Sequence, residues 1–308
     1  MFSLTLRNIR NITPLRVRIA IGPFFSFFYY FYYSYIKSNP FQPHTLSIEE
    51  TIQKIIQENL SAIRFGDGEI SLITNANIPF QNKNKDLAEK MEKILQSNHS
   101  TLLICILNIW GGKIHELEKK TYWFELHHFF KYSRVWERLL HKDQLYGDAF
   151  ITRPYLTIKD KTRSEAIFKN IQNIWKDKDV VLIEGEKARS GVGNNLFSTV
   201  KSIERILCPA ENAYSSYQEI LEEAKKLSRE KLILLSLGPT AKVLGYELFL
   251  LGYRVIDIGH TDMEYDMFTL QSKKLVKVAH KYFNEIGERY PEDCTDKKYL
   301  SEIITHIH

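Results

Sequence analysis

Short apolar runs that alternate with helical patterns constrain the fold of this chain more than any other feature of its sequence. Runs typical of buried strands occupy residues 60–65, 101–107, 179–183, 203–207, 232–236 and 254–258. Helical spacing is found between them, over residues 48–56, 86–96, 121–141, 161–175, 214–227 and 240–250. A further short strand is expected at Phe150–Thr152. The alternation predicts a Rossmann-like α/β fold, with a mostly parallel, twisted sheet and helices on both faces.

The carboxyl ends of the predicted strands carry most of the polar and glycine-rich loops. Ligands of such sheets bind beyond these ends, so four loops are expected to converge on one edge. In the first loop, Arg64–Glu69, the carboxylates of Asp67 and Glu69 flank a glycine. A carboxylate pair at this position can hold a divalent metal against a phosphate. Asp-Gly is also a common turn dipeptide, so these residues alone leave a hairpin turn open.

Two further loops have features of a phosphate or sugar contact. Gly238-Pro239-Thr240 precedes a predicted helix, whose free N–H groups and positive dipole end attract anions. An ordinary strand-to-helix turn is the alternative, and the lysine-serine ending of a Walker loop is missing. Residues 184–195 combine acidic and basic side chains with two glycines after a strand, which favours a ligand contact over a solvated surface loop.

The fourth loop follows the last predicted strand and contains His260, Asp262 and Glu264 at alternate positions. In an extended backbone these three side chains would share one face. A histidine and two carboxylates on one face suit a metal, a base that activates a hydroxyl, or a clamp on sugar hydroxyls.

Three motifs of these loops occur in order along the chain: RFGDGE, IEGEKARSGVGNNLF and LGPTAKVLGYELFLLGYRVIDIGHTDMEY. Together they resemble the bacterial GT-D-type glycosyltransferases, a family first catalogued as a domain of unknown function, over roughly residues 47–286. The resemblance implies a Rossmann-like glycosyltransferase with a DXE motif, a nucleotide-diphosphate sugar donor and a divalent cation, usually manganese. Asp67 and Glu69 stand at the DXE positions and would hold the metal on the donor diphosphate.

The expected reaction is transfer of a hexose, with glucose as the expected sugar, from a UDP-sugar to a growing glycan. A Lewis acid would stabilise the departing diphosphate, with Mn²⁺ as the expected cation and Mg²⁺ as the alternative. Asp262 or Glu264 would orient or deprotonate the acceptor hydroxyl, and His260 would assist at the metal. The residues expected to bind the donor are Arg64, Phe65, Gly66, Glu186, Arg189, Gly193, Asn194, Gly238, Pro239 and Thr240.

Two departures from the family pattern leave sugar and acceptor specificity open. The chain has Gly193-Asn194-Asn195 where the family usually has Gly-Asn-Asp, and Asp266-Met267-Phe268 where it usually has a second acidic-aromatic pair. A metal-dependent nucleotide-sugar hydrolase or phosphoesterase could use the same carboxylates. A non-catalytic protein that only binds a sugar phosphate is a third reading of these residues.

The net charge of +5 does not indicate a nucleic-acid-binding protein. Five basic residues before Glu49 account for it, and the remainder is neutral overall, so no basic patch that follows a phosphate backbone is implied. The three cysteines are odd in number, widely spaced and without a CxxC pair, and we interpret them as reduced core thiols.

Residues 1–46 form a basic and aromatic N-terminal segment with a linker, ahead of a domain predicted to span residues 47–308. Residues 19–36 contain ten aromatic side chains and no charge. Peripheral contact with a membrane interface, a helix packed on protein or forming an oligomer, and a true span all remain open for them. The expected location is the cytoplasm, at the cytoplasmic face of the membrane if the segment binds lipid.

Overall fold

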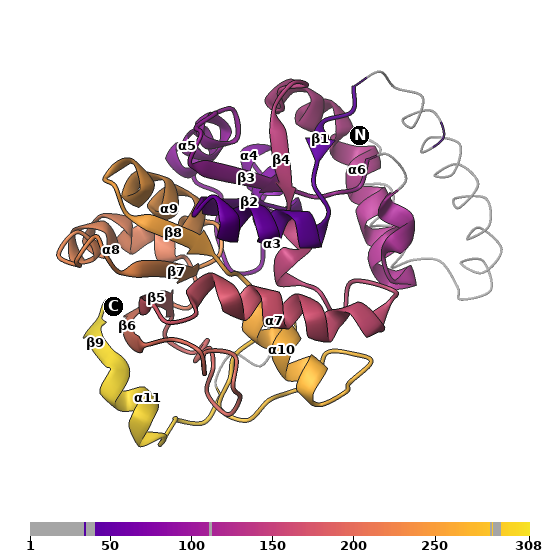
Figure 1. Cartoon of the computed structure of the whole chain (residues 1–308). Coiled ribbons are helices and arrows are strands. Elements are labelled where there is room, and N and C mark those ends of the chain that lie inside the picture. The colour runs from indigo at the N-terminus through magenta and orange to yellow at the C-terminus, as the bar shows by residue number, and fades with distance from the viewer. Residues whose placement is uncertain (1–33, 35–40, 111–112, 284, 286–290) are drawn as a thin grey trace, which may run out of the picture.

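Nine parallel strands form one sheet in the computed structural model, which describes residues 34, 41–110, 113–283, 285 and 291–308 (Figure 1). Within these residues the strand order is β1-β4-β3-β2-β8-β7-β5-β6-β9. The strands are β1 (His44–Thr45), β2 (Ser61–Phe65), β3 (Leu102–Ile106), β4 (Leu145–Asp148), β5 (Asp179–Gly185), β6 (Ser202–Cys208), β7 (Leu232–Ser236), β8 (Arg254–Asp257) and β9 (Ile303–His306). The predicted α/β fold with a parallel sheet is confirmed.

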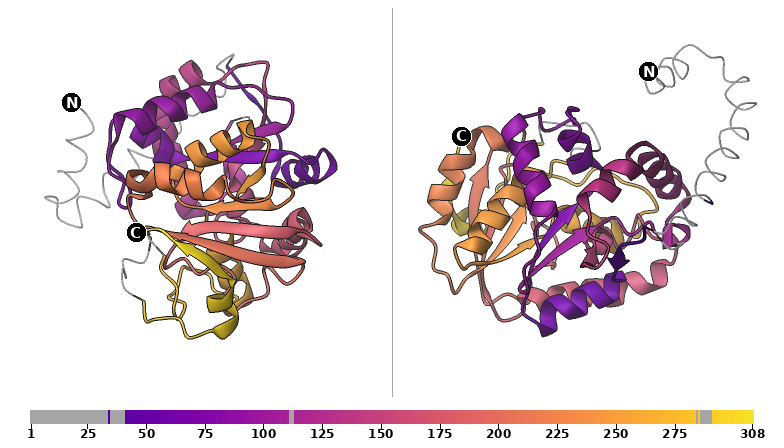
Figure 2. Two further views of the ribbon diagram at one scale, coloured as in Figure 1. Left: turned by 90° about the vertical axis from the view of Figure 1, so that its left-hand side faces the viewer. Right: turned by 90° about the horizontal axis from the view of Figure 1, so that it is seen from above.

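Helices cover both faces of the sheet (Figure 2). One group, in which neighbouring helices are in contact, is α4 (Asp67–Ile73), α5 (Lys85–Leu95), α9 (Thr240–Leu250) and α8 (Tyr217–Ala224). On the other face α3 (Ile48–Gln57) packs on α7 (Ser164–Trp175), and Phe168 of α7 contacts two aromatic rings of α10 (Thr261–Thr269). The other α-helices of the described residues are α6 (Lys119–Leu139) and α11 (Lys297–Glu302).

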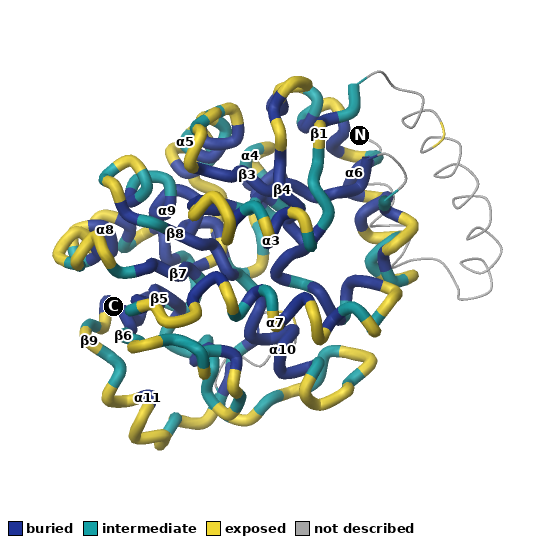
Figure 3. The backbone as a smooth tube through the Cα atoms, viewed as in Figure 1, coloured by how far each residue is buried: buried dark blue, intermediate teal, exposed yellow. Residues whose placement is uncertain are grey.

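The local sequence explains the element boundaries. Helix α3 begins at a capping box, in which the Ser47 side chain accepts from the Glu50 N–H and the Glu50 carboxylate accepts from the Ser47 N–H. Strand β5 is a continuous apolar run, and Val180–Ile183 are almost completely buried because helices cover both faces of a parallel sheet. Figure 3 shows the strands as the buried centre and the outer helix faces and loops as the exposed part.

Two expected boundaries differ from the structure. The strand predicted at Phe150–Thr152 is wrong: the strand is β4, and residues 149–152 form a 3₁₀ turn. The reason is Asp148, whose carboxylate accepts from the Phe150 N–H at 2.8 Å and turns the chain where the strand ends. The sheet also includes β1, which lies before the domain boundary predicted at residue 47.

Cys105 and Cys208 are buried thiols, as predicted, whereas Cys294 is partly exposed. The aromatic segment at residues 19–36 lies outside the described residues except for residue 34, so the interpretations of that segment stay predictions. Of the helices that the structure describes, none has the length and apolar character needed to cross a bilayer.

Candidate functional site

The carboxyl ends of β2, β8 and β7 are neighbours in the sheet, so the loops that follow them meet. The Ser236 hydroxyl donates to the Gly259 carbonyl at 2.9 Å, which joins the loop after β7 to the loop after β8. The side chain of Arg64, near the end of β2, donates to the Asp257 carbonyl oxygen at 3.0 Å. The fourth loop follows β5, which pairs in parallel with β7, and its Gly191 N–H donates to Asp262 of α10 at 2.7 Å, so the four predicted loops lie along one edge.

Asp67 and Glu69 lie in the first turn of α4, so the hairpin-turn alternative is wrong. Glu69 is buried, and its Oε2 accepts from the Gly66 N–H at 2.8 Å, which closes the helix N-terminus. Its Oε1 lies 3.2 Å from Nζ of Lys242 on α9. Both oxygens of Glu69 are thus in contact with protein groups.

The Asp67 carboxylate accepts hydrogen bonds from the N–H groups of its own helix turn, Asp67 and Gly68. Burial and then the neighbouring Glu69 charge raise the pKa of Asp67 above its usual range, and the Arg153 charge acts in the opposite direction. The site therefore places an incompletely compensated carboxylate at a helix N-terminus, beyond the end of β2.

A buried ion-pair network lies beneath these carboxylates. Asp257 at the end of β8 is 2.9 Å from Lys242 Nζ and 3.0 Å from Arg64 Nη2. Burial opposes ionisation of Asp257, but the charges of Arg64 and Lys242 hold its pKa below its usual range. Arg64 also donates to the Ala149 carbonyl at 3.3 Å, so this predicted donor-binding residue joins β2 to β8 and to the end of β4.

Gly259 is required by the close approach of Arg64. Its φ is +39°, and a Cβ built there would lie 1.8 Å from Arg64 Nη2. In this loop glycine therefore serves the ion-pair network.

Arg153, which follows the 3₁₀ turn after β4, is a site residue that the sequence analysis missed. Its guanidinium forms an ion pair with Glu285, and its Nη2 lies 3.2 Å from Nδ1 of His260. Its charge also acts on Asp67 and Glu264. In the sequence, Arg153 directly follows the strand expected at Phe150–Thr152 and precedes Pro154. A basic residue at the expected end of a strand was the available indication of a site residue.

The shared face predicted for His260, Asp262 and Glu264 is wrong, because these residues begin the helix α10 and not an extended segment. Positions two apart on a helix point in different directions. Glu264 Oε2 accepts from the N–H groups of Tyr155 and Leu156 at 2.9 and 2.7 Å. His260 alone of the three is partly exposed at the sheet edge.

Asp262 belongs to a second buried network, centred on Lys281. The Lys281 Nζ lies 2.6 Å from Asp262 and 2.7 Å from Asp266, and its side chain is fully buried. Asn194 donates to the same two carboxylates at 2.8 and 2.6 Å. Burial and then the Asp262 charge raise the pKa of Asp266 to about 6. Lys281 was not singled out from the sequence.

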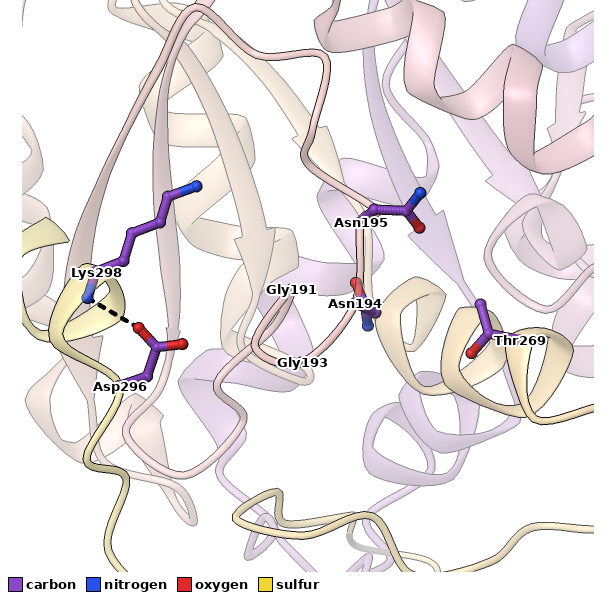
Figure 4. A pocket seen from close by; sticks show the side chains of 7 residues that line it. All are labelled: Gly191, Gly193, Asn194, Asn195, Thr269, Asp296 and Lys298. Carbon is purple, nitrogen blue, oxygen red and sulfur yellow. Dashed lines mark hydrogen bonds between the residues drawn. The ribbon is translucent and has the colours of Figure 1, made fainter.

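The loop at residues 184–195, called the middle loop below, is held by contacts with α10 and with the C-terminal segment. Arg189, predicted to face phosphate, is buried and donates to the carbonyls of His280 and Glu292 at 2.7 and 2.6 Å. Glu186 lies 3.2 Å from the imidazole of His306. Gly193 and Asn194 line a polar pocket of about 470 Å³ (Figure 4), together with Gly191, Asn195, Thr269, Asp296 and Lys298.

Gly238-Pro239-Thr240 leads into α9 as predicted, with Pro239 at the N-cap and no side-chain cap. Gly238 has a φ of +52°, and a Cβ built there would lie 3.0 Å from the Phe80 ring. The Thr240 hydroxyl is buried and has no hydrogen-bond partner in the described part of the chain. Thr240 is therefore not the cap of α9.

The fit of a divalent cation can be judged from these contacts. Across the ranges described, no three histidine, cysteine or acidic side chains lie close enough together to hold a metal ion. Asp67 fits as a ligand because no cationic side chain of the described residues forms an ion pair with its carboxylate. Mg²⁺-type sites commonly use one or two carboxylates and complete their coordination with substrate phosphates and water.

A parallel sheet with helices on both faces and polar loops at its carboxyl edge defines the class of Rossmann-like α/β proteins, whose ligands bind at that edge. The family model described as "Glycosyltransferase GT-D fold" matches residues 62–286. This chain therefore belongs to the GT-D-fold glycosyltransferase family, and the resemblance seen in its motifs is confirmed.

Curated relatives agree with this assignment. The chain is 37% identical over 265 residues to "Glycosyltransferase GlyD" of Streptococcus pneumoniae serotype 4, covering 84% of this chain and 32% of the relative. It is 35% identical over 273 residues to "Probable glycosyl transferase Gly" of Streptococcus gordonii, covering 86% of this chain and 39% of the relative. The chain thus spans about a third of the length of these relatives.

Solved structures are similar over nearly their full length. A domain of unknown function 1792, described as having a distinct glycosyltransferase fold, is 37% identical with a TM-score of 0.83, covering 86% of this chain and 96% of that one. "A New Glycosyltransferase (DUF1792) from Streptococcus sanguinis" is 34% identical with a TM-score of 0.83, covering 87% and 100%.

Proposed function

We propose that this chain transfers a hexose, with glucose as the first candidate, from a UDP-sugar to a hydroxyl of a growing glycan, with Mn²⁺ or, secondarily, Mg²⁺ bound. The observation that carries the proposal is the Asp67 carboxylate, which lies at the N-terminus of α4 beyond the end of β2 and touches no cationic side chain of the described residues. Family membership supplies the reaction class.

Asp67 would hold the cation against the donor diphosphate. When bound, the cation supplies Lewis-acid stabilisation of the negative charge that develops on the departing nucleotide. Glu69 is the second ligand that the DXE motif implies, and binding through its Oε1 would exchange the contact with Lys242. Lys242 would remain paired with Asp257 in that case.

The beginning of α9 would receive part of the donor diphosphate. Its N-terminal N–H groups present the positive end of the helix dipole, and the exposed Gly238 allows close approach of a phosphate. Thr240 adds a hydroxyl that has no partner within the described residues.

His260 is the best-placed base for the acceptor. Asp262 is neutralised by Lys281 and Glu264 accepts two backbone N–H groups, whereas the imidazole of His260 is partly exposed beside Arg153. In the proposed step the acceptor oxygen bonds to the sugar carbon, the bond from that carbon to the diphosphate breaks, and His260 takes the hydroxyl proton. In this proposal Asp67 is the carboxylate that binds the metal, and His260 is a separate base that receives the acceptor proton.

The test is product formation with a panel of UDP-sugars and acceptor glycans, with Mn²⁺ or with EDTA. Wild-type protein should form glycosylated product with Mn²⁺, and Asp67→Asn should form none. Free sugar without glycosylated acceptor would indicate hydrolysis instead, and undiminished transfer in EDTA or by the variant would refute the metal site. Because the chain matches about a third of its curated relatives, the test requires this chain by itself.

We also propose that the enzyme acts in the cytoplasm, where nucleotide-activated sugars are made, with residues 19–36 in peripheral contact with the membrane. Fractionation of cells that express the full chain and a chain without residues 1–40 tests the contact. Equal distribution of both between soluble and membrane fractions would argue against it.

A further inference from the structure

Helix α6 presents a basic and aromatic face to solvent. Its buried side chains lie on one side of the helix, and exposed residues spaced three or four apart lie on the opposite side. These exposed residues, called the α6 stripe below, are Lys120, Trp123, Phe124, His127, Lys131 and Arg134. From Lys120 to Arg134 the stripe is about 21 Å long. It is therefore a continuous surface and not a scatter of single side chains.

The charged side chains of the α6 stripe all have the same sign. None of its six positions, all of which the structure describes, is acidic. The exposed side of α5 is different, because Lys85 and Lys90 form ion pairs there with Glu89 and Asp86, four residues away, as on an ordinary solvated helix. A basic amphipathic helix without such acidic neighbours is typical of a surface that meets an anionic partner.

Two adjacent aromatic side chains lie among these cations. Trp123 is 37% exposed and Phe124 is 54% exposed. The other tryptophans of the chain, Trp110, Trp136 and Trp175, are buried. Exposure of large apolar rings to water has a free-energy cost, so their position beside cations favours a partner that accepts both. Tryptophan, phenylalanine and basic residues together are characteristic of helices that lie in the interface of an anionic bilayer.

The N-terminal segment joins the fold near α6 (Figure 1). It leads into β1 at the edge of the sheet, and Lys113 Nζ, in the 3₁₀ helix before α6, donates to the Thr45 carbonyl of β1 at 3.1 Å. The same 3₁₀ helix contacts α6. Residues 1–40 contain four arginines and the uncharged run at residues 19–36 with its ten aromatic side chains. A sequence suited to a bilayer interface is therefore attached close to α6.

We propose that the α6 stripe docks on an anionic membrane surface, with its cations at the lipid phosphates and with Trp123 and Phe124 among the headgroups. The inference goes beyond the contact proposed for residues 19–36, because it places a second contact on a folded helix of the transferase domain. Each basic side chain at an anionic surface strengthens binding about fivefold. Helix α4, which carries Asp67, contacts α6, so docking would hold the proposed site beside the bilayer.

The experiment measures tryptophan quenching in the full chain by vesicles of equal parts phosphatidylcholine and phosphatidylglycerol, with bromine on the acyl chains of the phosphatidylcholine. Bromine quenches a tryptophan only when the ring reaches the lipid. Residues 1–40 contain no tryptophan and the three other tryptophans are buried, so quenching reports Trp123. The wild type should be quenched, and Trp123→Phe should bind the vesicles without quenching. Quenching that persists in Trp123→Phe, or a wild type that binds and is not quenched, would overturn the proposal.

Sedimentation with unbrominated vesicles of the same composition measures the affinity. Lys131→Gln combined with Arg134→Gln should weaken binding about thirtyfold, because two cations are removed from the stripe. The matched control combines Lys169→Gln with Lys176→Gln, which removes two exposed lysines at α7, and it should stay within about threefold of wild type. Both double variants should keep the wild-type Tm, since all four side chains are exposed. Equal weakening in both would show that only net charge matters and would overturn the proposal.

Two further outcomes would assign the α6 stripe to another partner and overturn the proposal. One is self-association of the full chain without lipid that is lost when Trp123→Ala and Phe124→Ala are combined, which would indicate a second copy. The other is tighter binding to a single-stranded DNA oligonucleotide than to the vesicles. Transfer to a soluble acceptor is measured separately, and Lys131→Gln with Arg134→Gln should keep the wild-type activity. The membrane contact and the proposed reaction can therefore fail independently.

Discussion

Replacement of Lys281 by methionine should destabilise the fold by about 3–5 kcal/mol, the usual cost of removing one partner from a buried ion pair. The Lys281 side chain is fully buried, and its Nζ lies 2.6 Å from Asp262 and 2.7 Å from Asp266. Each contact contributes roughly 6 kcal/mol of gross Coulomb energy at an effective dielectric constant of about 20, and the desolvation of three charged groups offsets much of the sum.

The assay is urea unfolding monitored by tryptophan fluorescence. Lys281→Met should regain stability as the pH falls from 8 to 5, because Asp266 would then be protonated in the folded state. The sign follows from linkage: a carboxyl whose folded pKa exceeds its unfolded pKa stabilises the fold on acidification. In the wild type the pKa of Asp266 is already about 6 with Lys281 in place, and loss of the cation should raise it further.

Two further variants test the role of the buried Lys281 network. Lys298→Met removes an exposed lysine that lines the pocket in Figure 4, and it should change the unfolding free energy by less than about 0.5 kcal/mol. Adding Asp266→Asn to Lys281→Met should restore at least about 1 kcal/mol, since one buried charge is removed. A loss below about 1 kcal/mol in Lys281→Met, or no recovery in the double variant, would show that the network does not hold the middle loop on α10.

Three further predictions concern stability and the site. Gly259→Ala should cost about 2 kcal/mol or more in urea unfolding because its Cβ would meet Arg64, whereas Gly193→Ala, with a φ of +76° and open space, should cost about 1 kcal/mol; equal losses would contradict this. Asp67→Asn should abolish transfer yet keep a Tm at or above that of the wild type at pH 7.5. Burial raises the pKa of Asp67, so its ionised carboxylate destabilises the fold and its removal should not lower the Tm. A Tm several degrees below that of the wild type would refute this explanation. As the pH rises from 3.8 to about 6, ionisation of the buried Asp266 should lower the stability of the wild type, and Asp266→Asn should remove this contribution. An unchanged slope in an unfolding series over that range would argue against the raised pKa of Asp266.

The edge of the sheet that carries the site could be predicted because it depends on one property of the chain. If all strands are parallel, their carboxyl ends meet at one edge whatever the strand order, and the polar loops follow the strands. The charge partners depend on strand order, which local patterns do not contain. Arg64 and Asp257 are 193 residues apart in sequence and become neighbours only because β8 lies beside β2. Arg64 was therefore predicted to face phosphate, although its guanidinium is paired within the sheet.

The shared face predicted at residues 260–264 was wrong because it assumed the two-residue period of a strand. Alternation of His260, Asp262 and Glu264 suggested an extended segment, whereas Met263 and Met267, both buried and four residues apart, follow the helical period. The apolar residues determine which face is buried, so they were the better indicator of structure. The helix separates the three polar side chains and leaves only His260 partly exposed at the sheet edge.

Glu125 illustrates a signal that the sequence contains and that becomes interpretable only with the fold. Counting back from Trp136 through Tyr132 and Phe129 along the helical period leads to position 125, where an apolar residue would be expected and a glutamate stands. In isolation this exception could mark a helix end or an oligomer contact. In the fold this position is buried on α6, and burial, followed by the charge of Asp67, raises the pKa of Glu125 well above its usual range. The helical period therefore locates the exception on the buried face of α6, whereas the residues that share its burial depend on the packing of α6 on α4, which the local pattern does not contain.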